Sequence, residues 1–170
     1  MTLSHLLVAA LPLALIAAAI YDVATYTIPN WLSLALAAIF PLAALSVGLS
    51  AGAIGMHFGV GFLVLLAGMG LFAAHVVGGG DAKLLAAASL WMGPAALVQF
   101  FVYAALIGGA LAFALILFRM ARLPRAVAGV PWLERLHEKR QGVPYALALA
   151  IGGLIAAPAS PLVKALLLAT

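Results

Sequence analysis

The chain consists of long apolar runs that are interrupted at only a few points by polar or charged residues. A transmembrane helix needs about 20 predominantly apolar residues, and this criterion divides the chain into six segments. We therefore expect an all-α, polytopic integral membrane protein, a single membrane-embedded domain over residues 1–170 with six transmembrane helices. The predicted helices are Leu3–Tyr21, Trp31–Ser50, Ile54–Val77, Ala82–Gly93, Ala95–Phe118 and Val143–Leu168.

The boundaries of these segments carry local signals. Pro29 and Asn30 predict the start of the second helix, because proline is favoured in a first helical turn. The dipeptide Gly93-Pro94 predicts a tight turn between the fourth and fifth segments. The fourth segment, Ala82–Gly93, is short for an upright span, so it is expected to be tilted or to lie beside a thinned or water-accessible region.

Composition excludes several classes of protein. The chain is 68% hydrophobic and only 7% charged, which leaves too few charges to cover the surface of a soluble domain. Cysteine is absent, which excludes disulfides, thiol catalysis and thiolate metal sites. No set of His and acidic residues has the spacing of metal ligands, and no serine has a plausible His–Asp partnership. We expect no metal and no cofactor.

The charged residues predict an orientation. Positively charged loops lie preferentially in the cytoplasm, so the basic loop over residues 119–142 is predicted to be cytoplasmic and both termini external. Its expected partner is anionic lipid and not nucleic acid, because the charges do not cover a soluble face. Six of the eight Lys and Arg residues lie in this loop: Arg119, Arg122, Arg125, Arg135, Lys139 and Arg140.

Aromatic and amphipathic features predict contacts with the membrane interface. Trp31, Trp91 and Trp132 are most simply interface anchors, because tryptophan is enriched at the level of the headgroups. Within the basic loop, residues 131–140 combine apolar and charged side chains. This pattern suits a short interfacial helix on anionic lipid.

Two of the four acidic residues stand alone in apolar surroundings. Glu134 and Glu138 lie in the basic loop, whereas Asp22 and Asp81 lie at the ends of predicted transmembrane helices. A carboxylate at the edge of a bilayer is costly to keep, so it is a candidate functional group. The predicted topology places both aspartates on the cytoplasmic side, which favours a shared acid/base site.

The residues around Asp81 favour the same interpretation. The three glycines of Gly78–Lys83 permit backbone conformations closed to other residues and the close approach of a peptide or helix. Asp81 is predicted at the start of a helix, where the dipole favours its ionised form, and Asp22 at a C-terminal end, where the dipole opposes it. Opposite environments suit a pair that shares a proton, although the pattern does not assign the proton to either residue.

Other interpretations of the same residues stay open. Asp81 can cap a helix, and Lys83 can tune its charge, contact a substrate or simply extend to the membrane interface. His75 is a further candidate near the glycines, or a helix-packing residue. The glycine-rich helices also fit a non-enzymatic transporter subunit or assembly scaffold that uses the aspartates for ion or helix contacts.

The two motifs, in their order along the chain, resemble those of the type IV prepilin peptidases. Asp22 followed by Ile28-Pro29-Asn30 matches D-x5-IPN, and the segment Gly78–Lys83 matches GxGDxK. These membrane aspartyl proteases are related in motif to presenilin-like GxGD proteases, and the resemblance covers nearly the whole chain. It implies that Asp22 and Asp81 are catalytic and that the site is shaped by Gly78, Gly80, Lys83, Pro29 and Asn30.

The resemblance also implies a substrate and a location. The substrate would be a type IV prepilin or pseudopilin, cut without a metal at the cytoplasmic face of the bacterial inner membrane. The chain is similar to the short stand-alone CpaA/TadV form, which implies peptidase activity without N-methyltransferase activity. Relatives often have Pro-Tyr-Gly where this chain has Pro144-Tyr145-Ala146. The basic loop is a candidate docking site for pilus assembly proteins or for the substrate.

Overall fold

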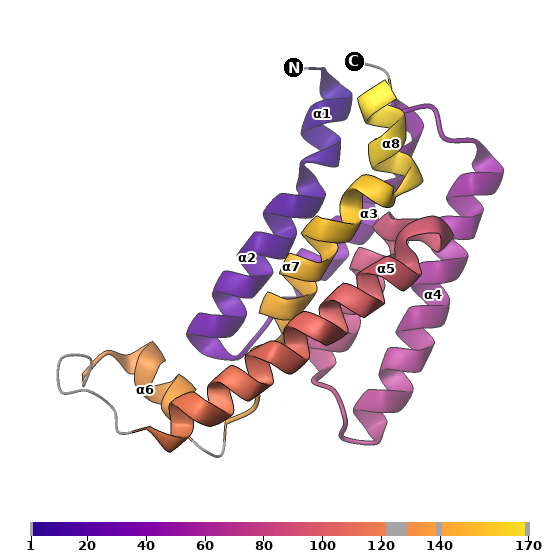
Figure 1. Ribbon diagram of the computed structural model, residues 1–170. Coiled ribbons are helices and arrows are strands. Elements are labelled where there is room, and N and C mark those ends of the chain that lie inside the picture. The colour runs from indigo at the N-terminus through magenta and orange to yellow at the C-terminus, as the bar shows by residue number, and fades with distance from the viewer. Residues whose placement is uncertain (1, 122–128, 139–140, 169–170) are drawn as a thin grey trace.

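The computed structural model describes residues 2–121, 129–138 and 141–168, and over these residues it is helical with no strand (Figure 1). The prediction of an all-α fold is confirmed. The helices are α1 (Leu3–Val8), α2 (Ala10–Thr25), α3 (Asn30–Ser46), α4 (Ala51–Ala73), α5 (Gly79–Met120), α6 (Pro131–His137), α7 (Tyr145–Ala156) and α8 (Pro161–Leu168), with a 3-10 turn, η2, at Ala157–Ala159.

Prolines divide two of the predicted segments. The first becomes α1 and α2, which meet at Ala9. Pro12 has no N–H to donate to the carbonyl of Val8, which weakens the helix at that point. The last segment becomes α7 with η2, followed by α8 at an angle of 52°, and Pro158 and Pro161 lie at this bend.

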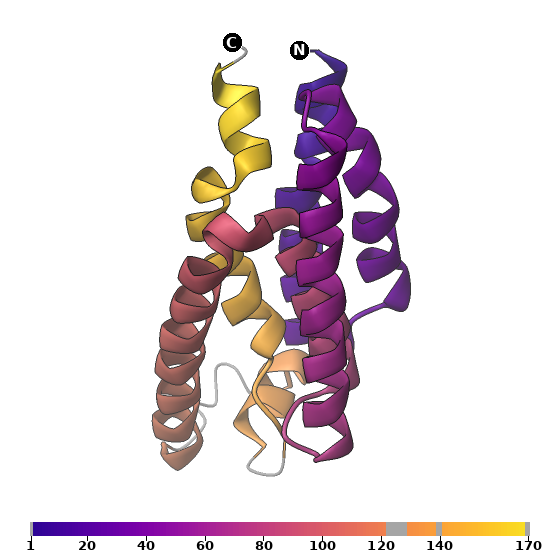
Figure 2. The same cartoon turned by 90° about the vertical axis from the view of Figure 1, so that its right-hand side faces the viewer.

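The predicted fourth and fifth segments form the two halves of α5. Gly93 interrupts the helix with φ 61° and ψ −176°, and Pro94 follows it. This confirms the predicted turn. Two views show α5 folding back on itself there: its first half rises behind α4, and its second half descends on the far side of α7 (Figures 1 and 2).

Three helical stretches are long and apolar enough to cross a membrane: Leu3–Thr25, Ala51–Ala73 and Gly79–Met120. The bent pair of α7 with η2 and α8 would make a fourth. The number of six spans and the external position of both termini remain predictions.

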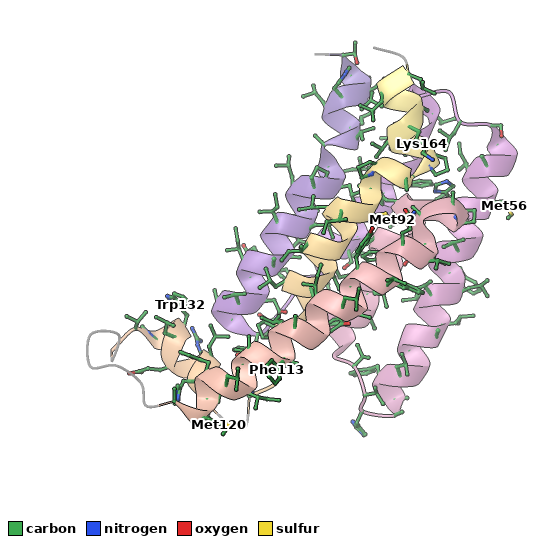
Figure 3. The ribbon with its side chains drawn as sticks, viewed as in Figure 1. Met56, Met92, Phe113, Met120, Trp132 and Lys164 are labelled. Atoms are coloured by element: carbon green, nitrogen blue, oxygen red, sulfur yellow. The ribbon has the colours of Figure 1, made fainter. Side chains whose placement is uncertain are left out.

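Apolar side chains cover the outside of the bundle: Met56, Phe113 and Met120 project outward, whereas Met92 is buried (Figure 3).

One prediction about the tryptophans is wrong. Trp91 is fully buried, and its indole N–H donates a hydrogen bond of 2.9 Å to the carbonyl of Leu36. It joins α5 to α3 in the core and does not lie at the membrane interface. Trp31 and Trp132 are exposed, and Trp132 lies on α6 at the outer edge of the molecule (Figure 3).

The chain termini and α6 lie at opposite ends of the bundle. Both chain termini lie at one end, and α6 lies at the other, together with the C-terminal end of α2 and the start of α5 (Figure 1). The predicted short helix of the basic loop is present as α6. Four basic residues of that loop lie outside the described residues: Arg122, Arg125, Lys139 and Arg140.

Candidate active site

Asp22 lies in the last turn of α2, as predicted, and it is only 6% exposed. Its Oδ2 accepts a hydrogen bond of 2.9 Å from the backbone N–H of Ala146. Ala146 is in the first turn of α7, where backbone N–H groups have no partner within the helix. The start of α7 therefore holds the Asp22 carboxylate from across the bundle.

This contact changes the predicted contrast between the two aspartates. Asp81 lies in the first turn of α5, as predicted. The positive end of α7 also faces Asp22, so the C-terminal end of α2 is not its only helix-end neighbour. Asp22 thus lies at the C-terminal end of α2, as predicted, and also accepts a hydrogen bond from the N-terminal end of α7, whereas Asp81 lies at the N-terminal end of α5.

Asp81 has an open acceptor. It is half-buried, and its Oδ1 is buried without a hydrogen-bond partner in the part of the chain that the structure describes. Such groups are rare in folded proteins and call for an explanation. The carboxylates of Asp81 and Asp22 lie near enough for their charges to interact. The structure therefore brings together two acidic groups that are distant in the sequence.

The motif glycines make room for their neighbours. A Cβ atom at Gly78 would lie 2.8 Å from Oδ2 of Asp81, and one at Gly80 would lie 3.2 Å from Cβ of Ile28. Neither glycine has a positive φ, so the predicted unusual backbone at these positions is wrong. The predicted close approach is confirmed: Gly78 accommodates the carboxylate, and Gly80 lets the two motifs pack together.

A hydrogen bond joins the two motifs directly. Nζ of Lys83 donates to Oδ1 of Asn30 over 3.0 Å. Asn30 is the first residue of α3 and Pro29 precedes it in an extended conformation, which confirms the predicted helix start. All of the predicted site residues therefore lie at one end of the bundle. His75, the other candidate, lies exposed in the loop between α4 and α5.

Sequence reasoning missed the place of two side chains, Tyr26 and Arg119, at this end of the bundle. Tyr26 ends α2 with φ 54°, and its hydroxyl is buried. Burial raises the pKa of this hydroxyl above its usual value of 10.0, and the nearby Arg119 guanidinium acts in the opposite direction. Arg119 also donates to the carbonyls of Leu136 and Gly142, each over 2.8 Å. It thereby ties the basic loop to this end of the bundle.

Tyr145 is the third missed residue. Its ring fits against Gly108, where a Cβ would meet the ring, and its hydroxyl approaches the carbonyl of Ala104 at 3.4 Å. It lies within electrostatic reach of Asp81. The only signal for it in the sequence was the Pro144-Tyr145 start of the last helix.

The model of the type IV leader peptidase family matches residues 9–113, which is more than half of the chain. The chain belongs to this family. The matched region contains both aspartates and both motif segments. No curated protein and no solved structure matches the chain. Family membership and the apolar helices together identify a protease of the membrane.

Proposed function

We propose that this leader peptidase family member is a membrane aspartyl endopeptidase that removes the leader of type IV prepilins or pseudopilins. Asp22 and Asp81 are its catalytic groups. The observation that carries the proposal is that these carboxylates, from α2 and α5, lie at one end of the bundle near enough for their charges to interact. One is held by the N–H of Ala146, and the other keeps a buried oxygen free to act as an acceptor.

The chemistry requires two carboxyl groups that share one proton. The ionised carboxylate takes a proton from a water molecule, whose oxygen attacks the carbonyl carbon of the scissile peptide bond. The protonated carboxyl gives its proton to the carbonyl oxygen, which forms a tetrahedral intermediate. When the C–N bond breaks, the leaving nitrogen takes the proton gained from water and the hydroxyl proton returns to its donor. The pair thus regains its starting charge.

The proposed reaction takes place at the cytoplasmic face of the bacterial inner membrane. The positive-inside rule supports this orientation, because α6 and Arg119 of the basic loop lie at the same end as the aspartates. The proposal includes six spans with external termini, and anionic lipid or pilus assembly proteins at the basic loop. It assigns no N-methyltransferase activity, following the similarity to the short stand-alone form.

The test is cleavage of a prepilin from the pilus locus of the source organism. The prepilin is co-expressed with the wild type, Asp22→Asn or Asp81→Asn, and each enzyme is checked for equal membrane insertion. Asparagine keeps the size of the side chain but cannot exchange protons, so each change should lower the rate by about 10³-fold.

The matched control is Glu138→Gln, which removes a carboxylate from an exposed position in the basic loop. It should cleave at the wild-type rate. Equal processing by both aspartate variants would remove these residues from the chemistry and favour a scaffold.

A further inference from the structure

A groove of about 430 Å³ lies between α3, α4 and the first half of α5. Most of its lining is apolar, and its polar residues come from the ends of α3 and α5 that carry the two motifs. Its lining includes Asn30, Ser33, Ala37, Phe58, Gly61 and Lys83.

The groove exists because α3 and α4 each pack on α5 and make little contact with one another. They meet where the rings of Phe40 and Phe58 are in edge contact, with centroids 5.5 Å apart. Toward Asn30 and Lys83 the two helices are not in close contact. Leu34 and Phe62 on the walls are 68% and 60% exposed, so the groove faces the surroundings of the bundle.

The floor and the length of the groove suit a helix. It extends from Asn30 to Ala37 along α3, which at 1.5 Å per residue is about 10 Å, or two helical turns. Gly61, Ala86 and Ala87 are small residues on its floor, and small residues let helices approach closely in a membrane.

The polar end of the groove adjoins the catalytic pair. Lys83 follows Asp81 by half a helical turn, and its ammonium group has three N–H donors, one of which reaches Asn30. Ser33 adds a buried hydroxyl that has no partner among the described residues. A peptide bond about to be cut must leave its helix, and the freed backbone groups then need new partners inside a membrane. The donors at this end can supply them.

We propose that this groove binds the first two turns of the substrate's apolar helix, with Lys83 and Ser33 binding the unwound backbone beside the cut. The inference rests on the proposed function. A second recess, lined by Ala19, Val23, Ala24, Trp132 and Leu147 among others, lies near the end of α2. Its lining is almost entirely apolar, so it cannot satisfy freed backbone groups in the same way.

Cysteine cross-linking tests the position of the substrate without relying on turnover. The chain has no native cysteine, so each introduced cysteine is the only one in the peptidase and any cross-link identifies its position. Ala37→Cys faces the groove, and the matched Ala38→Cys is the next residue of α3 and is exposed outside it. Both are made with Asp81→Asn, and the prepilin carries one cysteine in the first two turns of its helix.

We expect at least tenfold more cross-linking at Ala37→Cys than at Ala38→Cys. Equal cross-linking at the two positions would overturn the proposal. Preferential cross-linking at Ala24→Cys would also overturn it and would place the substrate in the second recess. Absence of cross-linking at every position, with a prepilin that the wild type cleaves, would overturn it as well.

Filling the groove gives a kinetic test. Ala37→Trp should raise KM at least tenfold with a smaller change in kcat, and Ala38→Trp should leave both near wild type. If the wild type cleaves the prepilin and Ala37→Trp leaves KM unchanged, the groove proposal fails alone. If the wild type cleaves no prepilin or pseudopilin of the locus, the proposed function itself fails, and the groove proposal with it.

Discussion

The break in α5 and the aspartate end of the bundle differ in how far their buried polar groups are hydrogen-bonded. Pro94 has no N–H for the carbonyl of Leu90, and Nδ1 of His57 donates to that carbonyl over 2.8 Å. The hydroxyl of Ser160 likewise donates to the carbonyl of Trp91 over 2.6 Å. The carbonyl groups that lose their helical partners at the interruption therefore accept hydrogen bonds from side chains instead.

At the aspartate end, two buried polar atoms have no partner among the described residues. They are Oδ1 of Asp81 and the hydroxyl of Ser33. Unpaired polar groups are costly in a membrane, so a structural role alone does not account for them. Ser89 is an exception to the contrast, since its unpaired hydroxyl lies in α5 about one turn before the break. The polar groups at the break are mostly paired, and the unpaired groups at the aspartate end support the proposal that this end serves binding and chemistry.

The largest effect on stability is expected for Gly93→Ala. Gly93 has φ 61° and ψ −176°, a conformation that is essentially restricted to glycine, and an added Cβ would collide with the His57 ring. We expect a loss of about 3 kcal/mol in the free energy of unfolding. Thermal unfolding in detergent measures it.

The control for the break is Gly109→Ala in the second half of the same helix. Nothing lies within 4 Å of a Cβ at Gly109, so this change should be neutral or stabilising by up to about 1 kcal/mol. Equal stability of the two variants would show that the break does not depend on glycine.

A smaller effect, on turnover instead of stability, is expected for Gly78→Ala. The added Cβ would lie 2.8 Å from Oδ2 of Asp81, so the carboxylate must move. Because φ of −66° is open to alanine, the fold should lose less than about 1 kcal/mol. We expect kcat for prepilin cleavage to fall about 10- to 100-fold, equivalent to about 1.4–2.7 kcal/mol in the activation barrier.

Gly70→Ala is the matched control, since a Cβ there meets nothing within 4 Å. It should keep both the stability and the turnover of the wild type. Wild-type kcat in Gly78→Ala would mean that the position of the Asp81 carboxylate does not limit the reaction.

The features predicted correctly from the sequence depend on local signals. The position of Asp22 in a last turn, the helix start at Asn30 and the turn at Gly93 follow from short patterns of apolar residues, proline and glycine. The contacts that complete the site join residues far apart in the chain. Ala146 and Asp22 are 124 residues apart, and no local pattern encodes their hydrogen bond.

The error at Trp91 has a different origin. In a membrane, residues that face lipid and residues that face the core are both apolar, so hydropathy does not distinguish them. The indole of Trp91 finds its partner in the carbonyl of Leu36 on another helix, which only the fold reveals.

The smallest effect is expected for Ala146→Gly, which creates the Pro-Tyr-Gly sequence expected from the family resemblance. Asp22 accepts its hydrogen bond from the backbone N–H of Ala146, which glycine also provides. Ala146 is fully buried in the first turn of α7, so glycine should cost about 1 kcal/mol of stability through helix propensity and lost packing. Prepilin cleavage should stay within about twofold of wild type, because the donor to Asp22 is kept. A loss above tenfold at equal insertion would show that the Ala146 methyl group itself shapes the site.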